Sequence, residues 1–233
     1  MGDVRERLLN LRDIKGAEEE RGVGEQGTEG GIVEFIGQSV EYVGGYGNDA
    51  TIESAARTCT QTKTVGDGRV FVGRLVERGH MSPVEFGFAD FLIECDRAIQ
   101  QELTRHRHLS FNVESTRMCD YRKKPLRFVT KPPEGMTVPE EAVELLEELC
   151  EVCAEVYFTM LSMGAPRDYA RKAFTLALAS KMRVAGNTRT WLELLPKRLS
   201  KFAHPEIREL SRLIYKMMRR LFPGAFSKMT TEA

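Results

Sequence analysis

The strand-like segments of this chain come early, whereas the last 95 or so residues have apolar side chains spaced as in helices. Strands are expected in residues 32–43 (one or two), 84–94 and 128–130, and helices in about 49–57, 70–78, 97–107, 139–163, 166–184, 188–195 and 205–221. The long helical stretch follows the strands and does not alternate with them. This order favours an α+β fold with a central, mostly antiparallel sheet and packed helices.

Residues 1–30 differ from the rest of the chain, because they are rich in Gly and Glu and poor in large apolar side chains. We expect them to form a flexible N-terminal segment with a short helix at about 4–14. Residues 31–233 are then expected to form a single domain. Their number suffices to bury a sizeable core without disulfides or a metal.

The overall charge gives no reason to expect a nucleic acid or membrane partner, since 34 Lys and Arg balance 34 Asp and Glu. The N-terminus has no apolar signal-peptide core, and no apolar run approaches the ~20 residues of a membrane span. We therefore expect a cytoplasmic protein. Cys150 and Cys153 form a lone CxxC pair in a predicted helix. Because no second pair or suitably spaced histidines accompany them, no metal site is expected.

The most unusual segment is residues 102–117, ELTRHRHLSFNVESTR. Arg side chains suit phosphate and carbonyl oxygens, while Ser, Asn and Glu can bind the edges of a base or sugar. On a helix, Arg105, His106 and Arg107 would project about 100° apart. They therefore cannot all face one ligand from one subunit. Either they bind different ligands or a second chain supplies the remaining walls.

Simpler interpretations of this segment stay open at the level of composition. Cations at the end of a helix complement the helix dipole without any ligand. His106 and His108 form only a weak metal signal at this spacing. A basic cluster could also bind RNA, but neither an aromatic-rich RNA motif nor a helix-turn-helix pattern accompanies it.

The pattern RHR, then seven residues, then Ser resembles the signature of the flavin-dependent thymidylate synthases, with residues 105–107, 108–114 and Ser115 as its parts. Further segments are similar to that family in the same order. They are IESAARTC at 52–59, GHMSPVE at 79–85, AR at 170–171, NTRTW at 187–191 followed by Arg198, and SKFAHPE at 200–206. The resemblance covers about residues 32–222.

The resemblance implies a homotetramer whose active sites combine residues from several subunits. It implies FAD binding by Ser82, Glu85, Arg105, His106, Arg107, Asn112, Glu114, Asn187, Arg189 and Glu193, although Arg189 can equally be structural. It implies binding of a uridine nucleotide by Glu102, Arg105, Glu114, Ser115, Thr116, Arg117, Arg171 and Arg198. Ser115 and Arg198 are the expected catalytic residues, and His80 is expected near the flavin and folate.

The expected reaction is methylation at C5 of UMP, dUMP or both, with methylenetetrahydrofolate as carbon donor and NADPH as reductant through FAD. No cysteine has a recognisable base partner in the sequence, so a thiolate nucleophile is unsupported. The family dispenses with an obligatory enzyme nucleophile. Arg198 is expected to stabilise negative charge on the uracil oxygens.

Several positions depart from the family pattern. Phe86 stands in place of a His, Met118 in place of a Tyr, Phe174-Thr175 in place of Leu-Pro, and Glu193 in place of an Asn or His. They indicate either neutral drift or a changed substrate. The second interpretation resembles the UMP/dUMP methylase branch of polyoxin-type nucleoside-antibiotic biosynthesis. An ordinary dUMP-specific synthase and a non-catalytic FAD- or nucleotide-binding homologue remain as alternatives.

Overall fold

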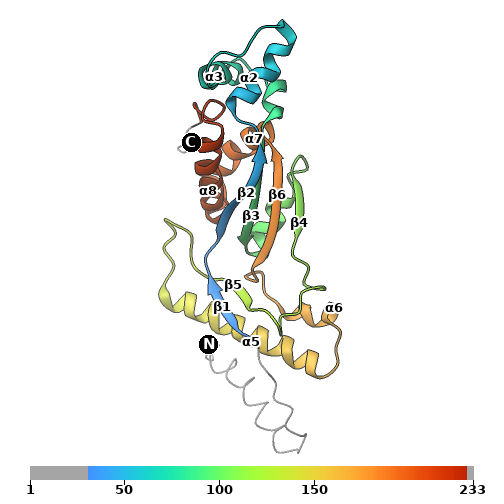
Figure 1. Cartoon of the computed structure of the whole chain (residues 1–233). Coiled ribbons are helices and arrows are strands. Elements are labelled where there is room, and N and C mark those ends of the chain that lie inside the picture. The colour runs from blue at the N-terminus through green and yellow to red at the C-terminus, as the bar shows by residue number, and fades with distance from the viewer. Residues whose placement is uncertain (1–30, 230–233) are drawn as a thin grey trace, which may run out of the picture. The chain divides into compact units, whose positions relative to one another are not determined.

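The computed structural model describes residues 31–229, so the expected N-terminal segment and its helix lie outside the described residues. The described chain divides into two compact units (Figure 1). Unit 1 comprises residues 31–37, 114–132 and 137–179, and unit 2 comprises residues 38–113, 133–136 and 180–229. The expectation of a single domain from residue 31 onward stays a prediction.

Unit 2 is built on a four-stranded sheet in the order β2-β3-β6-β4, in which every neighbouring pair is antiparallel. Its strands are β2 (Ser39–Tyr46), β3 (Phe88–Cys95), β4 (Ser110–Val113) and β6 (Ser180–Asn187). The two central strands pair along eight residues each. This sheet confirms the expected α+β class with a mostly antiparallel sheet.

The helices of unit 2 pack against this sheet and against one another. They are α2 (Asp49–Arg57), α3 (Arg69–Glu77), α4 (Arg97–Thr104), α7 (Thr188–Leu199) and α8 (Pro205–Leu221), with 3-10 turns η1 (Thr58–Thr60) and η2 (Ser82–Phe86). Figure 1 shows α8 alongside β2, and α7 packs against α8. In the core, the ring of Phe91 on β3 meets Trp191 of α7 edge-on, with 5.2 Å between the ring centroids. Fully buried aromatic contacts of this kind anchor α7 on the sheet.

Unit 1 is smaller and has its own core. Its elements are β1 (Val33–Ile36), β5 (Leu126–Val129), α5 (Glu140–Ser162), α6 (Arg167–Ala170) and the 3-10 turn η3 (Arg171–Ala173). The two strands form a parallel pair, and α5 runs beside β1. The rings of Tyr121, Phe128 and Tyr157 all pack against Phe174. An aromatic cluster therefore holds the segment after α6 in place.

The expected helix over residues 166–184 is wrong. Only α6 and η3 are helical there, and residues 180–187 form the central strand β6. Ser180, Met182 and Val184 are buried while Arg183 between them is exposed, which is the alternation of a strand. Pairing with β3 on one side and β4 on the other overrides the local preference of this Ala- and Lys-containing segment.

Other differences concern element ends. The expected strand from residue 84 begins at Phe88, because the residues before it form η2. The helix expected to reach residue 107 ends at Thr104, and β4 forms at Ser110–Val113, where no strand was expected. Helix α7 continues through Pro196 to Leu199. A proline so near the end of a helix removes one hydrogen bond without ending the helix.

Two kinds of feature are absent from residues 31–229. No helix among them combines the length and apolar character that a membrane crossing needs. No group of three or more His, Cys, Asp or Glu side chains among them lies close enough together to hold a metal ion.

Candidate active site

The cationic motif lies in a turn between α4 and β4. The carboxylate of Asp96 accepts a hydrogen bond from the backbone N–H of Ile99 at 2.7 Å and thereby starts α4. The helix ends at Thr104, and the backbone N–H of His106 then bonds to the carbonyl of Leu103 at 3.0 Å. Since the motif side chains leave a turn and not a helix, the 100° spacing expected for them does not apply.

A close approach to β6 fixes this turn. Leu109 is buried, and a Cβ atom added at Gly186 would come within 2.4 Å of its Cδ2 atom. The carbonyl of Gly186 also accepts a hydrogen bond from the indole N–H of Trp191 at 3.2 Å. Glycine at position 186 lets the motif turn pack this closely beside the start of α7, because a side chain there would require Leu109 to shift.

Helix α7 presents one polar face toward the motif turn. Asn187 caps the helix, because its side-chain oxygen accepts a hydrogen bond from the backbone N–H of Thr190 at 2.9 Å. Thr190, Glu193, Leu194 and Lys197 follow at helical positions i, i+3, i+4 and i+7. Residues at this spacing share one face of a helix.

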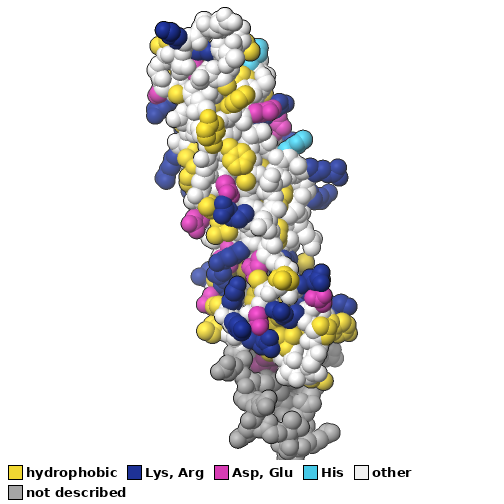
Figure 2. Space-filling model, turned by 45° about the vertical axis from the view of Figure 1, so that its right-hand side comes forward, with side chains coloured by type: hydrophobic (Ala, Val, Ile, Leu, Met, Phe, Trp, Pro, Cys, Tyr) yellow, Lys and Arg dark blue, Asp and Glu magenta, His cyan; other side chains and the backbone are white. Residues whose placement is uncertain are grey.

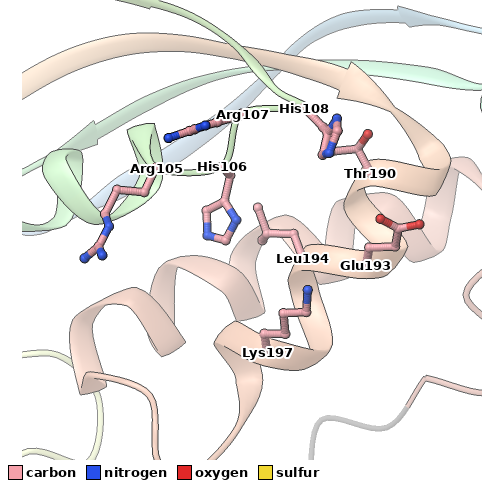
Figure 3. Close-up of a pocket in the computed structure, with 8 residues that line it drawn as sticks. All are labelled: Arg105, His106, Arg107, His108, Thr190, Glu193, Leu194 and Lys197. Carbon is pink, nitrogen blue, oxygen red and sulfur yellow. The ribbon is translucent and has the colours of Figure 1, made fainter.

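The motif turn and this face of α7 enclose a pocket of about 280 Å³ (Figure 3). Its lining residues are Arg105, His106, Arg107, His108, Thr190, Glu193, Leu194 and Lys197. In Figure 3, Glu193 and Lys197 point from α7 toward the turn that bears the two histidines. Three permanent cations beside one carboxylate make a site suited to an anionic ligand with phosphate oxygens.

Arg198 lies one residue beyond this face and is held by two side chains. Its Nε donates a hydrogen bond to Nε2 of His106 at 3.0 Å, and one of its terminal nitrogens bonds to Glu102 at 2.9 Å. Burial lowers the pKa of His106 below its ordinary value, and Arg198, Lys197 and Arg105 lower it further. The imidazole is therefore neutral at neutral pH.

Arg189 bridges two acidic residues of unit 2. Its guanidinium lies 2.8 Å from Glu85 in η2 and 2.8 Å from Glu193 on its own helix. All three side chains are largely exposed, and such ion pairs contribute about 0–1 kcal/mol to stability. The arrangement favours the structural alternative for Arg189, since the side chain links η2 to the rim of the pocket.

The residues expected to bind the nucleotide phosphate lie together in unit 1. Arg171 donates a hydrogen bond to the hydroxyl of Thr116 at 3.3 Å. Arg117 forms an ion pair with Asp168 at 3.1 Å, and its backbone N–H bonds to the Ser115 hydroxyl at 3.3 Å. Figure 2 shows Lys and Arg side chains gathered on this unit, with Asp and Glu among them. Side chains of α6 and η3 therefore hold the loop that carries Ser115, the predicted catalytic serine.

The remaining expected residues are more dispersed. Ser82 and Asn112 are exposed, on η2 and β4 respectively, and His80 is exposed in the turn after α3. Glu114 accepts a hydrogen bond from the Tyr121 hydroxyl at 2.9 Å within unit 1. The ligand roles of all these residues stay predictions.

Sequence reasoning missed four pocket residues, His108, Thr190, Leu194 and Lys197. Three of them could have been found from their i, i+4 and i+7 spacing on α7, taken together with Glu193. Asp168 was also missed. Its partner Arg117 stands 51 residues earlier, so no local pattern joins the two.

The departures from the family pattern fall into different environments. Phe86 and Met118 are 57% and 79% exposed, so neither fills a core position. Phe174 packs 4.6 Å from Tyr157 between ring centroids, as part of the core of unit 1. Glu193 faces the pocket. Of these four, Glu193 has the most direct route to altering what the pocket binds.

Comparison with known proteins identifies the family to which this chain belongs. Residues 40–224 match the family model described as "Thymidylate synthase complementing protein". The chain therefore belongs to the family of flavin-dependent thymidylate synthases and is an enzyme.

Two relatives from mycobacteriophages carry the name probable flavin-dependent thymidylate synthase. The protein of phage L5 is 29% identical over 79% of this chain and 82% of its own length. That of phage D29 is 31% identical over 70% of this chain and 73% of its own. Among solved structures, the UMP/dUMP methylase PolB from Streptomyces cacaoi bound with 5-Br dUMP is 24% identical, with a TM-score of 0.71 over 85% of this chain and 99% of that one. The likeness to PolB concerns the fold.

Proposed function

We propose that this enzyme methylates C5 of both UMP and dUMP, with methylenetetrahydrofolate as one-carbon donor and NADPH as reductant through FAD. The observation that carries the proposal is the cationic pocket between the motif turn and α7 in a chain of this family. Extension to UMP is supported by the fold shared with PolB, which is named a UMP/dUMP methylase. Glu193 in the pocket supports a changed site.

The pocket residues fit a flavin nucleotide. Arg105, Arg107 and Lys197 offer N–H donors and positive charge for the pyrophosphate oxygens. Neutral His106 adds a polar edge without a further charge. Bound flavin would supply the reducing equivalents that convert a transferred methylene group to methyl.

The residues of unit 1 fit the nucleotide phosphate. The Ser115 and Thr116 hydroxyls can donate to phosphate oxygens, and Arg117 and Arg171 can neutralise its charge. Arg198 would stabilise the negative charge that develops on the uracil oxygens. A preorganised donor of this kind lowers the activation barrier by a few kcal/mol.

The proposal extends to the assembly and its setting. The protein would act in the cytoplasm as a homotetramer with active sites shared among subunits. A role in polyoxin-type nucleoside-antibiotic synthesis would require UMP to be its substrate in the cell.

The test is an assay of purified protein with UMP and dUMP side by side, in the presence of NADPH and methylenetetrahydrofolate. We expect a yellow protein whose flavin band bleaches with NADPH, and a mass gain corresponding to one methyl group on both nucleotides.

Arg117→Ala should raise KM at least about 10-fold by removing a phosphate contact. Arg122→Ala is the matched control, since this arginine is exposed and paired with Asp120.

Each other outcome selects an alternative. Methylation of dUMP alone would identify an ordinary thymidylate synthase. A flavin-loaded protein that methylates neither nucleotide would overturn the proposed function.

A further inference from the structure

Arg198 is oriented entirely by side chains of unit 2. Its two hydrogen bonds come from different elements: Glu102 stands on α4 and His106 in the motif turn. The Arg198 and Glu102 side chains are only 22% and 33% exposed. Because solvent reaches this pair less than it reaches most surface ion pairs, the geometry is held more firmly. Two bonds to different atoms fix the plane of the guanidinium as well as its position.

The hydrogen bond to His106 requires one protonation state. A guanidinium has only donors, so the Nε2 atom of His106 must accept and must carry no proton. The proton of the neutral ring is then on Nδ1. A second proton would convert Nε2 into a donor facing another donor, and would place a new positive charge beside Arg198.

The surroundings of His106 are mostly cationic. Arg198 and Lys197 face it from α7, and Arg105 adjoins it in its own turn, whereas Glu102 faces it from α4. Arg107, His108 and Glu193 line the same pocket. Burial, Arg198, Lys197 and Arg105 lower the pKa of His106, and the carboxylate of Glu102 opposes them. The acceptor state is therefore the stable one at neutral pH.

We propose that Glu102 and His106 are positioning residues that aim the Arg198 guanidinium, and that protonation of His106 releases it. This inference rests on the proposed function, in which Arg198 acts on the uracil ring. It differs from the expectation that Glu102 binds substrate and His106 binds cofactor directly. His106 also lines the pocket, so the state of one imidazole links the pocket to Arg198.

The first experiment measures the titration of His106 by NMR in the full protein without ligands, and so needs no activity. Arg198→Met removes a cation and should raise the pKa of His106. Glu102→Gln removes the opposing carboxylate and should lower it. An unchanged His106 titration in both variants would overturn the linkage. Gln101→Ala, an exposed neighbour on α4, is the matched control and should leave it unchanged.

The second experiment measures kcat and KM against pH. In wild type, kcat should fall on the acid side as His106 gains its proton. His106→Gln keeps a carbonyl acceptor at every pH, so the kcat that remains in this variant should show no acid limb. Glu102→Ala should lower kcat by up to about 100-fold through misplacement of Arg198, with a smaller change in KM, and Glu102→Gln should restore most of it.

An acid limb that persists unchanged in His106→Gln would refute the proposal, as would a full-rate Glu102→Ala enzyme. Thermal unfolding of each variant separates lost positioning from lost fold. If wild type methylates neither nucleotide, the proposed function fails, and the NMR shifts still decide whether His106 and Arg198 are linked. The two failures are therefore distinguishable.

Discussion

Asp49 shows how a single side chain ties two distant segments of unit 2 together. It lies in the first turn of α2, is 2% exposed, and accepts hydrogen bonds from the backbone N–H groups of Gly224 at 2.6 Å and Ala225 at 3.3 Å. Burial nevertheless raises its pKa, because desolvation outweighs these bonds and the nearby charge of Arg69. The ionised carboxylate therefore organises the C-terminal segment while itself being disfavoured by its surroundings.

Replacement of Asp49 should reveal both effects. Asp49→Ala leaves two buried N–H groups without their acceptor and should reduce the free energy of unfolding by about 1–3 kcal/mol. Asp49→Asn keeps one acceptor oxygen and should lose less. Because the folded pKa of Asp49 exceeds the ordinary value of 3.8, its carboxyl binds more protons in the folded state, so the contribution of Asp49 to stability should fall as pH rises through that window. Urea unfolding at several pH values tests this. The stability of Asp49→Asn relative to wild type should therefore increase as pH rises through the same window.

The cysteines should differ sharply in reactivity. Cys59 is exposed, whereas Cys95 and Cys150 are buried. Burial raises the pKa of Cys95 and raises that of Cys150 to about 11, so neither forms a thiolate at neutral pH. Titration of the native protein with a thiol reagent should show a fast phase that Cys59→Ser removes, while Cys95 and Cys150 react only after unfolding. Rapid labelling of Cys95 or Cys150 in the folded protein would reopen the question of a cysteine nucleophile.

At the scale of elements, sequence patterns correctly predicted helices whose formation depends on local interactions. The helix expected at about 49–57 is observed as α2, and its N-cap is Asn48. The last helix was predicted from its apolar spacing and starts at Pro205 as expected. By contrast, β6 depends on its neighbours in the sheet, which lie 67 or more residues earlier in the chain. No local pattern in 180–187 contains that information.

The candidate site likewise has features that the sequence predicts and features that it does not. The motif at 105–107 and Arg198 were found in the sequence because each belongs to a recognisable pattern. Their hydrogen bond was not, because a separation of 92 residues lies beyond any periodicity. The mistaken helix at 166–184 likewise concealed that α6 ends after Ala170 and turns Arg171 toward Thr116.

Two adjacent glycines in β2 provide a test of sheet packing. A Cβ atom at Gly45 would lie 2.3 Å from the backbone carbonyl oxygen of Phe88, whereas at Gly44 it would meet nothing within 4 Å. Gly45→Ala should therefore force β2 and β3 apart and reduce the free energy of unfolding by about 1–3 kcal/mol. Gly44→Ala should be neutral or stabilise by up to about 1 kcal/mol through the unfolded chain. Equal unfolding midpoints in chemical denaturation would contradict the described register.

At the scale of the whole molecule, the predicted site residues fall into two groups. Unit 2 contains the pocket and Arg198, and unit 1 contains Ser115, Arg117 and Arg171. The proposed homotetramer combines residues of several chains in each active site. A closed symmetric assembly makes this possible with one kind of subunit, because every chain can give one group of residues to one site and the other group to another site.

Mixing two inactive variants tests this arrangement. Ser115→Ala and Arg198→Ala should each lose most activity alone. If every site takes Ser115 from one chain and Arg198 from another, random mixed tetramers should regain about one quarter of wild-type activity, because that fraction of sites receives both intact residues. Co-expression with two affinity tags isolates the mixed assemblies, and sedimentation of the 26.4 kDa chain verifies their size.

Mixed assemblies of Ser115→Ala with Arg117→Ala serve as the control, since the two residues adjoin in one loop and should not complement. Absence of recovery in the first mixture would mean that each chain supplies both residues to its own site.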